Sequence, residues 1–140
     1  MNKLKTFTIG GVHPHENKLT DEVAIQTLPL PKQLIIPLGQ NLGVPPKPIV
    51  KKGDEVKTGQ LIARAEAFIS SNMHAPASGK ILKIDDALDA SGYRRQAIFL
   101  DVAGDEWDEG IDTSNTIDRN IKLNKTEIVA LIKDCGLVGL

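Results

Sequence analysis

Residues 50–84, VKKGDEVKTGQLIARAEAFISSNMHAPASGKILKI, decide the fold of this chain. They contain two short β units, and each unit begins at a corner rich in glycine or proline, residues that favour tight turns. The first unit turns within 53–59, which begins and ends with glycine, and continues as a strand over 61–66. The second turns within 75–79, where glycine relaxes the exit from the corner, and continues over 81–84. The pattern predicts a mainly β domain in which a turn–strand unit is repeated once after a central hairpin.

Alternation of apolar and polar residues predicts how the strands are buried. In 61–66, Leu61, Ala63 and Ala65 fall on one face and the intervening residues on the other, which predicts a half-buried strand. The other expected elements are strands over 4–9, 34–38 and 96–102, and a polar turn region over 85–92.

The order and spacing of the two units resemble the biotinyl/lipoyl carrier fold, a flattened barrel of two small antiparallel sheets. The resemblance implies a mainly β barrel-sandwich hybrid, which the strand at 34–38 would close. Carriers of this kind present a lysine at the tip of the central hairpin, where the cofactor is attached as an amide. The tip here, within 67–73, contains no lysine, and Lys57 and Lys80 flank the corners instead. We therefore expect an unmodified carrier fold in which both lysines are solvated; a genuine biotinyl or lipoyl carrier, modified at Lys57 or Lys80, is the alternative.

Length and charge limit the classes of function. A chain of 140 residues can bury enough surface for one good core, so one compact domain is expected. The net charge of −1 gives no overall attraction to nucleic acid. Residues 1–84 carry 11 Lys and Arg against 6 Asp and Glu, whereas residues 85–140 carry 6 against 12. Two solvated faces explain this asymmetry; a basic barrel that docks an acidic partner is the alternative.

The sequence also bears on the compartment of the protein. Cys135 is the only cysteine, so neither an internal disulfide nor a metal-binding cysteine cluster is expected, and a reducing cytoplasm is the natural location. No apolar run approaches the roughly 18 residues of a membrane span. The first residues, MNKLKTFTIGG, lack the apolar stretch of a signal peptide. We expect no transmembrane segment, although the chain can still lie on a membrane complex.

The C-terminal segment is predicted to be helical from several independent features. Asn124 is a good N-cap, and Glu127 three residues later can complete a capping box. Gly136 provides the C-terminal stop. At helical spacing, one face carries Ile128, Leu131, Ile132 and Cys135. Cys135 is therefore expected to be a small buried apolar residue and not a reactive or cluster-binding thiol.

The histidines are the only candidates for a metal site. His13, His15 and His74 can in principle meet to bind zinc, but scattered histidines are ordinarily surface or packing residues, and their roles stay open. Neither a Gly-x-Ser-x-Gly elbow nor a His-Glu-x-x-His helix is present, which argues against a hydrolase. No catalytic, cofactor-binding or metal-binding residue is predicted in the chain.

Two biased segments have both structural and functional interpretations. Six of the eight prolines lie within 29–48, where edge strands and rigid connections are expected. The alternative is a free-standing interaction adaptor that binds a proline-recognition domain through Pro45 and Pro46. The acidic residues of 101–112 do not follow the ligand order of an EF-hand, so a solvated loop with Trp107 tucked against the domain is expected.

Two stretches resemble a known family. GGVHPHENK at 10–18 and LPLPKQLIIPLGQNLGVPPKPIVKKGDEVKTGQ at 28–60 resemble the N-terminal region of the C subunit of the Rnf-type ion-translocating electron transport complex, and the resemblance runs over essentially all 140 residues. The family pattern opens with Gly-Gly-(Ile/Val)-His-Pro, which residues 10–14 match. It continues through a Leu-Pro-Leu-Pro segment to the carrier-like barrel. His15 stands where proline is more usual.

The resemblance implies a larger redox protein. In the family, a helix such as that expected here leads into a glycine-rich loop that opens a flavin-binding domain, where backbone N–H groups can hold phosphate. FMN, NAD(H) and two four-iron (4Fe-4S) clusters are implied for the parent protein, all C-terminal to Leu140. We therefore expect this chain to be a truncated, non-catalytic scaffold fragment of a ferredoxin:NAD oxidoreductase subunit. We expect the fragment alone not to be an enzyme, whereas the parent protein would be one, as a subunit of an ion-translocating ferredoxin:NAD oxidoreductase.

The resemblance also implies an organisation and partners. The expected parts are an N-terminal strand and family-specific extension (1–28), the barrel-sandwich hybrid domain (29–104), an acidic linker (105–123) and a helix that leads into the flavin-binding domain (124–140). The implied partners are that flavin domain and other subunits of the complex. The implied location is peripheral, on the cytoplasmic side of the inner membrane.

Overall fold

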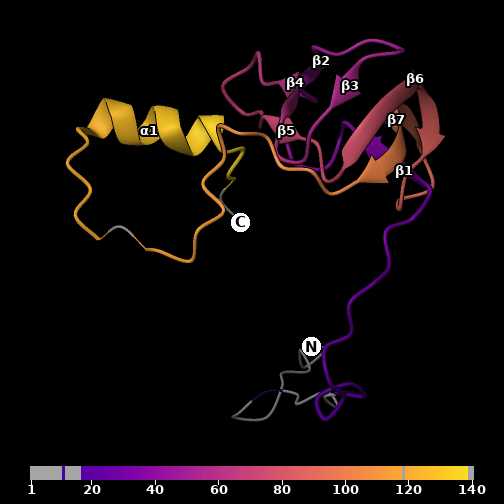
Figure 1. Cartoon of the computed structure of the whole chain (residues 1–140), viewed down its shortest axis with the longest axis horizontal. Helices are drawn as coiled ribbons and strands as arrows, with labels where there is room; N and C mark the ends of the chain where they lie inside the picture. Colours follow the sequence, from indigo (N-terminus) through magenta and orange to yellow (C-terminus); the bar gives the residue numbers. More distant parts are fainter. Residues whose placement is uncertain (1–10, 12–16, 118, 139–140) are drawn as a thin grey trace, which may run out of the picture.

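The computed structural model describes residues 11, 17–117 and 119–138. Two antiparallel sheets form the domain, with strand orders β1-β7-β6-β3 and β2-β4-β5, and Figure 1 shows α1 outside them. The elements are β1 (Gln33–Pro37), β2 (Lys47–Pro48), β3 (Glu55–Val56), β4 (Leu61–Arg64), β5 (Met73–His74), β6 (Ser78–Leu88), β7 (Arg94–Gly104) and α1 (Lys125–Asp134). The predicted mainly β fold with a C-terminal helix is confirmed. The strand predicted over 4–9 lies outside the described residues.

Side chains from both sheets share one core. Ile62 from β4 packs in the same cluster as Ile81 from β6 and Leu100 from β7, and all three are fully buried. Burying one such side chain stabilises the fold by about 1.5–3 kcal/mol. The strand predicted over 34–38 is present as β1, which pairs with β7 and contributes Ile36 to this cluster. The two sheets are therefore held together by apolar contacts between them.

Strand β4 is more buried than the sequence predicts. Alternation placed Ile62 on a different face from Ala63, yet both residues are fully buried. The pairing of β4 with β5 shifts register between Leu61 and Ala63, so Ile62 is the extra residue of a bulge. A bulge breaks the strict alternation of a strand, and β4 is also the central strand of its sheet. The predicted alternation therefore holds for Ala63 and Ala65 against Arg64 and Glu66, which are exposed, and is wrong only at Ile62.

The hairpin of β6 and β7 is longer than predicted. Residues 85–88 were expected in a polar turn region, but β6 continues to Leu88, which pairs with Arg94. The turn itself is closed by Asp89, whose Oδ1 accepts hydrogen bonds from the backbone N of Ser91 and of Tyr93. Polar residues misled the prediction because this end of the ribbon is largely exposed to solvent.

The glycines of the two corners have different roles. Gly53 and Gly59 adopt φ of +94° and +82°, as expected of turn glycines. Gly79 does not relax a corner, since it lies within β6 and its φ is not positive. A Cβ at Gly79 would collide with the backbone carbonyl oxygen of Asp101 in β7. Glycine is required there because two backbones approach closely, which corrects the predicted role.

Helix α1 has the predicted ends but not the predicted burial. The Asn124 side chain accepts from the backbone N of Thr126 and Glu127, and the Glu127 carboxylate accepts from the backbone N of Asn124, so the capping box is confirmed. No residue of α1 is buried, and Cys135 at its C-cap is exposed. The prediction that Cys135 is buried is wrong, because none of the described residues covers the apolar face of this helix. Within the described residues, no helix has the length and apolar character needed to cross a bilayer.

Candidate functional site

A groove of about 640 Å³ lies beside β3. Strands β6 and β7 form one side, and the segment that follows β7 forms the other. Its charged lining comprises the carboxylates of Glu55, Asp101, Glu106, Asp108 and Glu109 and the ammonium groups of Lys57 and Lys80. A groove with this lining carries more negative than positive charge.

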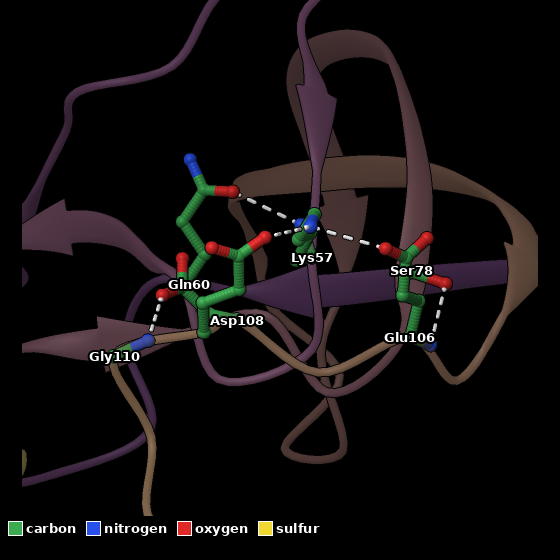
Figure 2. A network of polar contacts seen from close by, with 7 residues as sticks. Lys57, Gln60, Ser78, Glu106, Asp108 and Gly110 are labelled. Carbon is green, nitrogen blue, oxygen red and sulfur yellow. Dashed lines mark hydrogen bonds and ion pairs between the residues drawn. The ribbon is translucent and has the colours of Figure 1, made fainter.

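Lys57 is the centre of a network of polar contacts (Figure 2). Its Nζ lies 3.0 Å from Oε1 of Glu106 and 3.5 Å from Oε1 of Glu109. Its backbone N donates to Oε1 of Gln60 over 2.9 Å. The hydrogen bond with Glu106, followed by the charge of that carboxylate, raises the pKa of Lys57 above its ordinary value. Lys57 was expected to be a solvated residue, but its side chain is 39% exposed and ion-paired.

The segment 105–109 is attached to the barrel by its backbone. Thr58 N donates to Glu106 O over 2.8 Å, and Asp108 N donates to Thr58 O over 2.9 Å. Glu106 N also donates to Oγ of Ser78 over 3.0 Å, as Figure 2 shows. Trp107 lies against Gly59 as expected, yet it keeps 47% exposure. The first residues after β7 therefore act as an added edge of the barrel.

Sequence reasoning missed this attachment. Residues 57 and 106 are far apart in the chain, and no periodicity links them. The only signal was the asymmetry between a basic first part and an acidic second part, for which two solvated faces were preferred. Lys57, Glu106 and Glu109 bring part of that opposite charge into contact within one chain.

The geometry does not favour attachment of a cofactor to a lysine. A nucleophilic lysine must lose its proton, and the two carboxylates around Lys57 hold the proton on. Lys80 lies within β6, where its backbone is opposite that of Glu55 in the antiparallel pairing with β3. Neither residue is at the tip between β4 and β5, where the exposed residue Phe68 lies. The alternative of a biotinyl or lipoyl carrier therefore gains no support from the position of either lysine.

The structure bears on the zinc-site hypothesis and on the proline-rich adaptor hypothesis. His13 and His15 lie outside the described residues, and His74 is partly exposed in β5. Among the residues that the structure describes, no group of three or more His, Cys, Asp or Glu side chains is placed to hold a metal ion.

Pro46 is buried and Pro45 is exposed, so the pair does not present an open proline-rich ligand. This favours the rigid connection that was predicted there.

Replacing Lys57 with Met tests the network. We expect Lys57→Met to loosen segment 105–109, seen as faster hydrogen exchange at the backbone N–H of Asp108. Because the folded pKa of Lys57 is raised above 10.5, its contribution to stability is present below that pH and is lost as pH rises through the folded pKa. The free energy of unfolding should therefore fall more steeply above pH 10.5 in the unsubstituted protein than in the variant.

The matched control is Lys80→Met, which removes the same charge from the same groove. We expect it to leave the hydrogen exchange of segment 105–109 unchanged. Equal effects of the two substitutions would show that general charge, and not the pairing of Lys57, stabilises the segment.

Comparisons with known proteins place this geometry in context. Residues 5–105 match the family model described as the RnfC barrel sandwich hybrid domain. The chain is 44% identical over 140 residues to the C subunit of the "Proton-translocating ferredoxin:NAD(+) oxidoreductase complex" of Clostridium ljungdahlii, covering 98% of this chain and 30% of that protein. It is 37% identical over 142 residues to the C subunit of the "Ion-translocating oxidoreductase complex" of Rhodobacter capsulatus, covering 98% and 27%.

A third relative gives the same picture. The chain is 33% identical over 133 residues to the C subunit of the "Na(+)-translocating ferredoxin:NAD(+) oxidoreductase complex" of Acetobacterium woodii, covering 94% of this chain and 29% of that protein. The chain therefore spans less than a third of the length of these curated relatives.

Proposed function

Because the chain belongs to the family of RnfC barrel sandwich hybrid domains, we propose that it is the non-catalytic scaffold at the N-terminus of the C subunit in an ion-translocating electron transport complex. That complex would couple ferredoxin and NAD(H). The observation that carries the proposal is similarity over nearly the whole chain to C subunits of complexes whose names state this reaction. Other subunits of the complex are the proposed partners.

The chemistry of the residues supports a structural role. A four-iron cluster takes four thiolate ligands, and the whole chain contains only Cys135. Lys57, the most strongly engaged titratable group of the groove, is held as a cation and is unsuited to nucleophilic attack. The redox groups, FMN, NAD(H) and two 4Fe-4S clusters, would be bound by the part of a full-length subunit that follows this region. The scaffold would lie peripherally on the cytoplasmic side of the membrane.

A binding experiment tests the non-catalytic part of the proposal. Residues 1–140 are expected to bind neither FMN nor NADH at micromolar concentration, because the proposal places both sites in the part of a full-length subunit that follows this region. The measurement is FMN fluorescence, and NADH fluorescence in a second titration, with increasing protein. Saturable quenching of either ligand would contradict the proposal.

The carrier alternative is checked by the intact mass of the protein after expression with biotin and lipoate ligases. An added group on Lys57 or Lys80 would favour that alternative.

A chimera tests the assignment to the complex. This chain would replace the matching N-terminal region of the Clostridium ljungdahlii protein, to which it is 44% identical. Membranes of the chimeric strain are expected to retain ferredoxin-dependent NAD reduction, whereas deletion of the region should abolish it. The control is a chimera with Leu100→Asp, which places a charge in the core and should prevent assembly. A chimeric protein that accumulates at normal levels but supports no activity would refute the assignment.

A further inference from the structure

The apolar face of α1 is open to solvent. The exposed fractions of Ile128, Leu131 and Ile132 lie between 39% and 49%, although these residues form one stripe at helical spacing. The next apolar residues, Leu137 and Val138, are also exposed. A helix with a stripe of this kind ordinarily packs it against other protein. The stripe therefore indicates a contact that the described residues do not make.

The short length of α1 strengthens this argument. The helix has 10 residues, and isolated helices shorter than about 12–15 residues are marginal in water. Its capping box satisfies the first backbone N–H groups, but most helical stability in proteins comes from packing of an apolar face. No residue of α1 is buried, so the described residues supply little of that packing.

The C-terminal end of α1, in contrast, is fixed to the barrel. The Ser71 hydroxyl donates to the backbone O of Gly136 over 2.8 Å. Gly136 adopts φ of +69°, and a Cβ there would lie 2.5 Å from the backbone O of Asn72. The backbone of the helix end thus approaches the segment before β5 so closely that only glycine fits. Figure 1 shows this end of α1 beside β5, while the rest of the helix extends away from the sheets.

A groove of about 360 Å³ continues from this attachment point. The barrel contributes Asn41, Asn72 and His74 to its lining, and the chain after α1 contributes Gly136 and Val138. Cys135 also lines it, so the groove joins the exposed stripe of the helix. We call the stripe and this groove together the helix surface, which consists of Ile128, Leu131, Ile132, Cys135 and Val138 with the groove beside them.

We propose that the helix surface is covered by the polypeptide that follows residue 140 in a full-length subunit. This inference rests on the proposed function, because it requires a protein as long as the relatives. This chain covers only 27–30% of the length of the three relatives described above. Val138 already lies in the groove, so a following segment would start beside the surface it covers. A tethered segment has a high effective concentration and loses less freedom on docking than a separate protein. An intramolecular interface is therefore favoured over a second copy or another subunit.

The native cysteine provides the test, since Cys135 is exposed and lies within the helix surface. We expect a maleimide reagent to label Cys135 rapidly in residues 1–140 and at least about tenfold more slowly in the isolated full-length subunit, because labelling then requires local opening. Peptide mapping by mass spectrometry separates Cys135 from other cysteines. The control is Ser91→Cys in the exposed turn between β6 and β7, which should react equally in both proteins.

A second variant and a set of distinct outcomes make the test decisive. Leu131→Asp in the full-length subunit should restore rapid labelling of Cys135 and leave the Ser91→Cys control unchanged. Protection of Cys135 only in the assembled complex would assign the surface to another subunit. Protection of Cys135 in residues 1–140 at high protein concentration would assign it to a second copy. Either result overturns the proposal, as does equal labelling of Cys135 in residues 1–140 and in the full-length subunit. If the chimera is active while Cys135 stays reactive, this inference fails and the proposed function stands.

Discussion

Gly79→Ala is expected to lower the free energy of unfolding by about 3 kcal/mol or more, the upper range for overpacking in a closed core. The new Cβ would collide with the backbone carbonyl oxygen of Asp101, and backbone in a paired strand cannot move aside as a flexible side chain can. Gly79 also stands beside the register shift between Ser78 and Gly79, where β6 comes close to β7. Urea unfolding followed by far-ultraviolet circular dichroism measures the change.

Gly104→Ala is the matched control. Gly104 pairs with Ser78 at the end of the same hairpin, but a Cβ there would meet only the Ser78 hydroxyl oxygen at 3.5 Å, an ordinary contact. We expect its effect to stay within about 1 kcal/mol. If the two substitutions cost the same, the close approach of β6 and β7 at Gly79 is not what requires glycine there.

Leu100→Ala is expected to cost about 2–5 kcal/mol, the usual range for removing a buried leucine side chain and leaving a cavity. Leu100 is fully buried in β7, opposite Leu34 of β1 and Ile81 of β6. Its loss therefore weakens contacts with both neighbouring strands and with the facing sheet. The measurement is the urea midpoint together with the slope of the transition, which separates lost stability from a change in cooperativity.

Ile35→Ala provides the comparison for that prediction. Ile35 lies next to this cluster in β1, opposite Phe99, but it is 49% exposed. Because its side chain already contacts solvent, truncation should cost less than about 1 kcal/mol. A loss at Leu100 no larger than that at Ile35 would mean that the two sheets do not share a core at this position.

Local features of the fold could be predicted from the sequence. The turn glycines Gly53 and Gly59 have the positive φ that their corner implied, because that preference is a property of the residue itself. The capping box of Asn124 and Glu127 depends on residues three apart, which any helix starting there brings together. Alternation located most of β7, and the apolar residues between prolines located β1, for the same reason. In each case the cause and its effect lie within a few residues.

The errors arose where the cause is distant in sequence. Nothing in the residues around Gly79 indicates that Asp101 approaches it, and the length of β6 depends on the pairing that β7 offers. Burial of Cys135 was inferred from an apolar stripe, which shows that a face seeks contact but not whether the same chain supplies it. The pairing of Lys57 with Glu106 likewise follows from the path of the chain after β7. The domain boundaries at residues 28, 104 and 123 stay predictions.

The pairing of β1 with β7 has a consequence for how the protein is made. Gln33 pairs with Asp101, so β1 leaves the ribosome long before its partner exists. The hairpin of β6 and β7 closes through a short turn and can form at once, whereas closure of the barrel must wait for the end of β7. During that interval β1 is an unpaired strand that can bind to the wrong chain. Prolines lack the N–H donor that such pairing needs, so Pro29, Pro31 and Pro37 reduce the number of backbone donors that β1 and its flank offer to another chain.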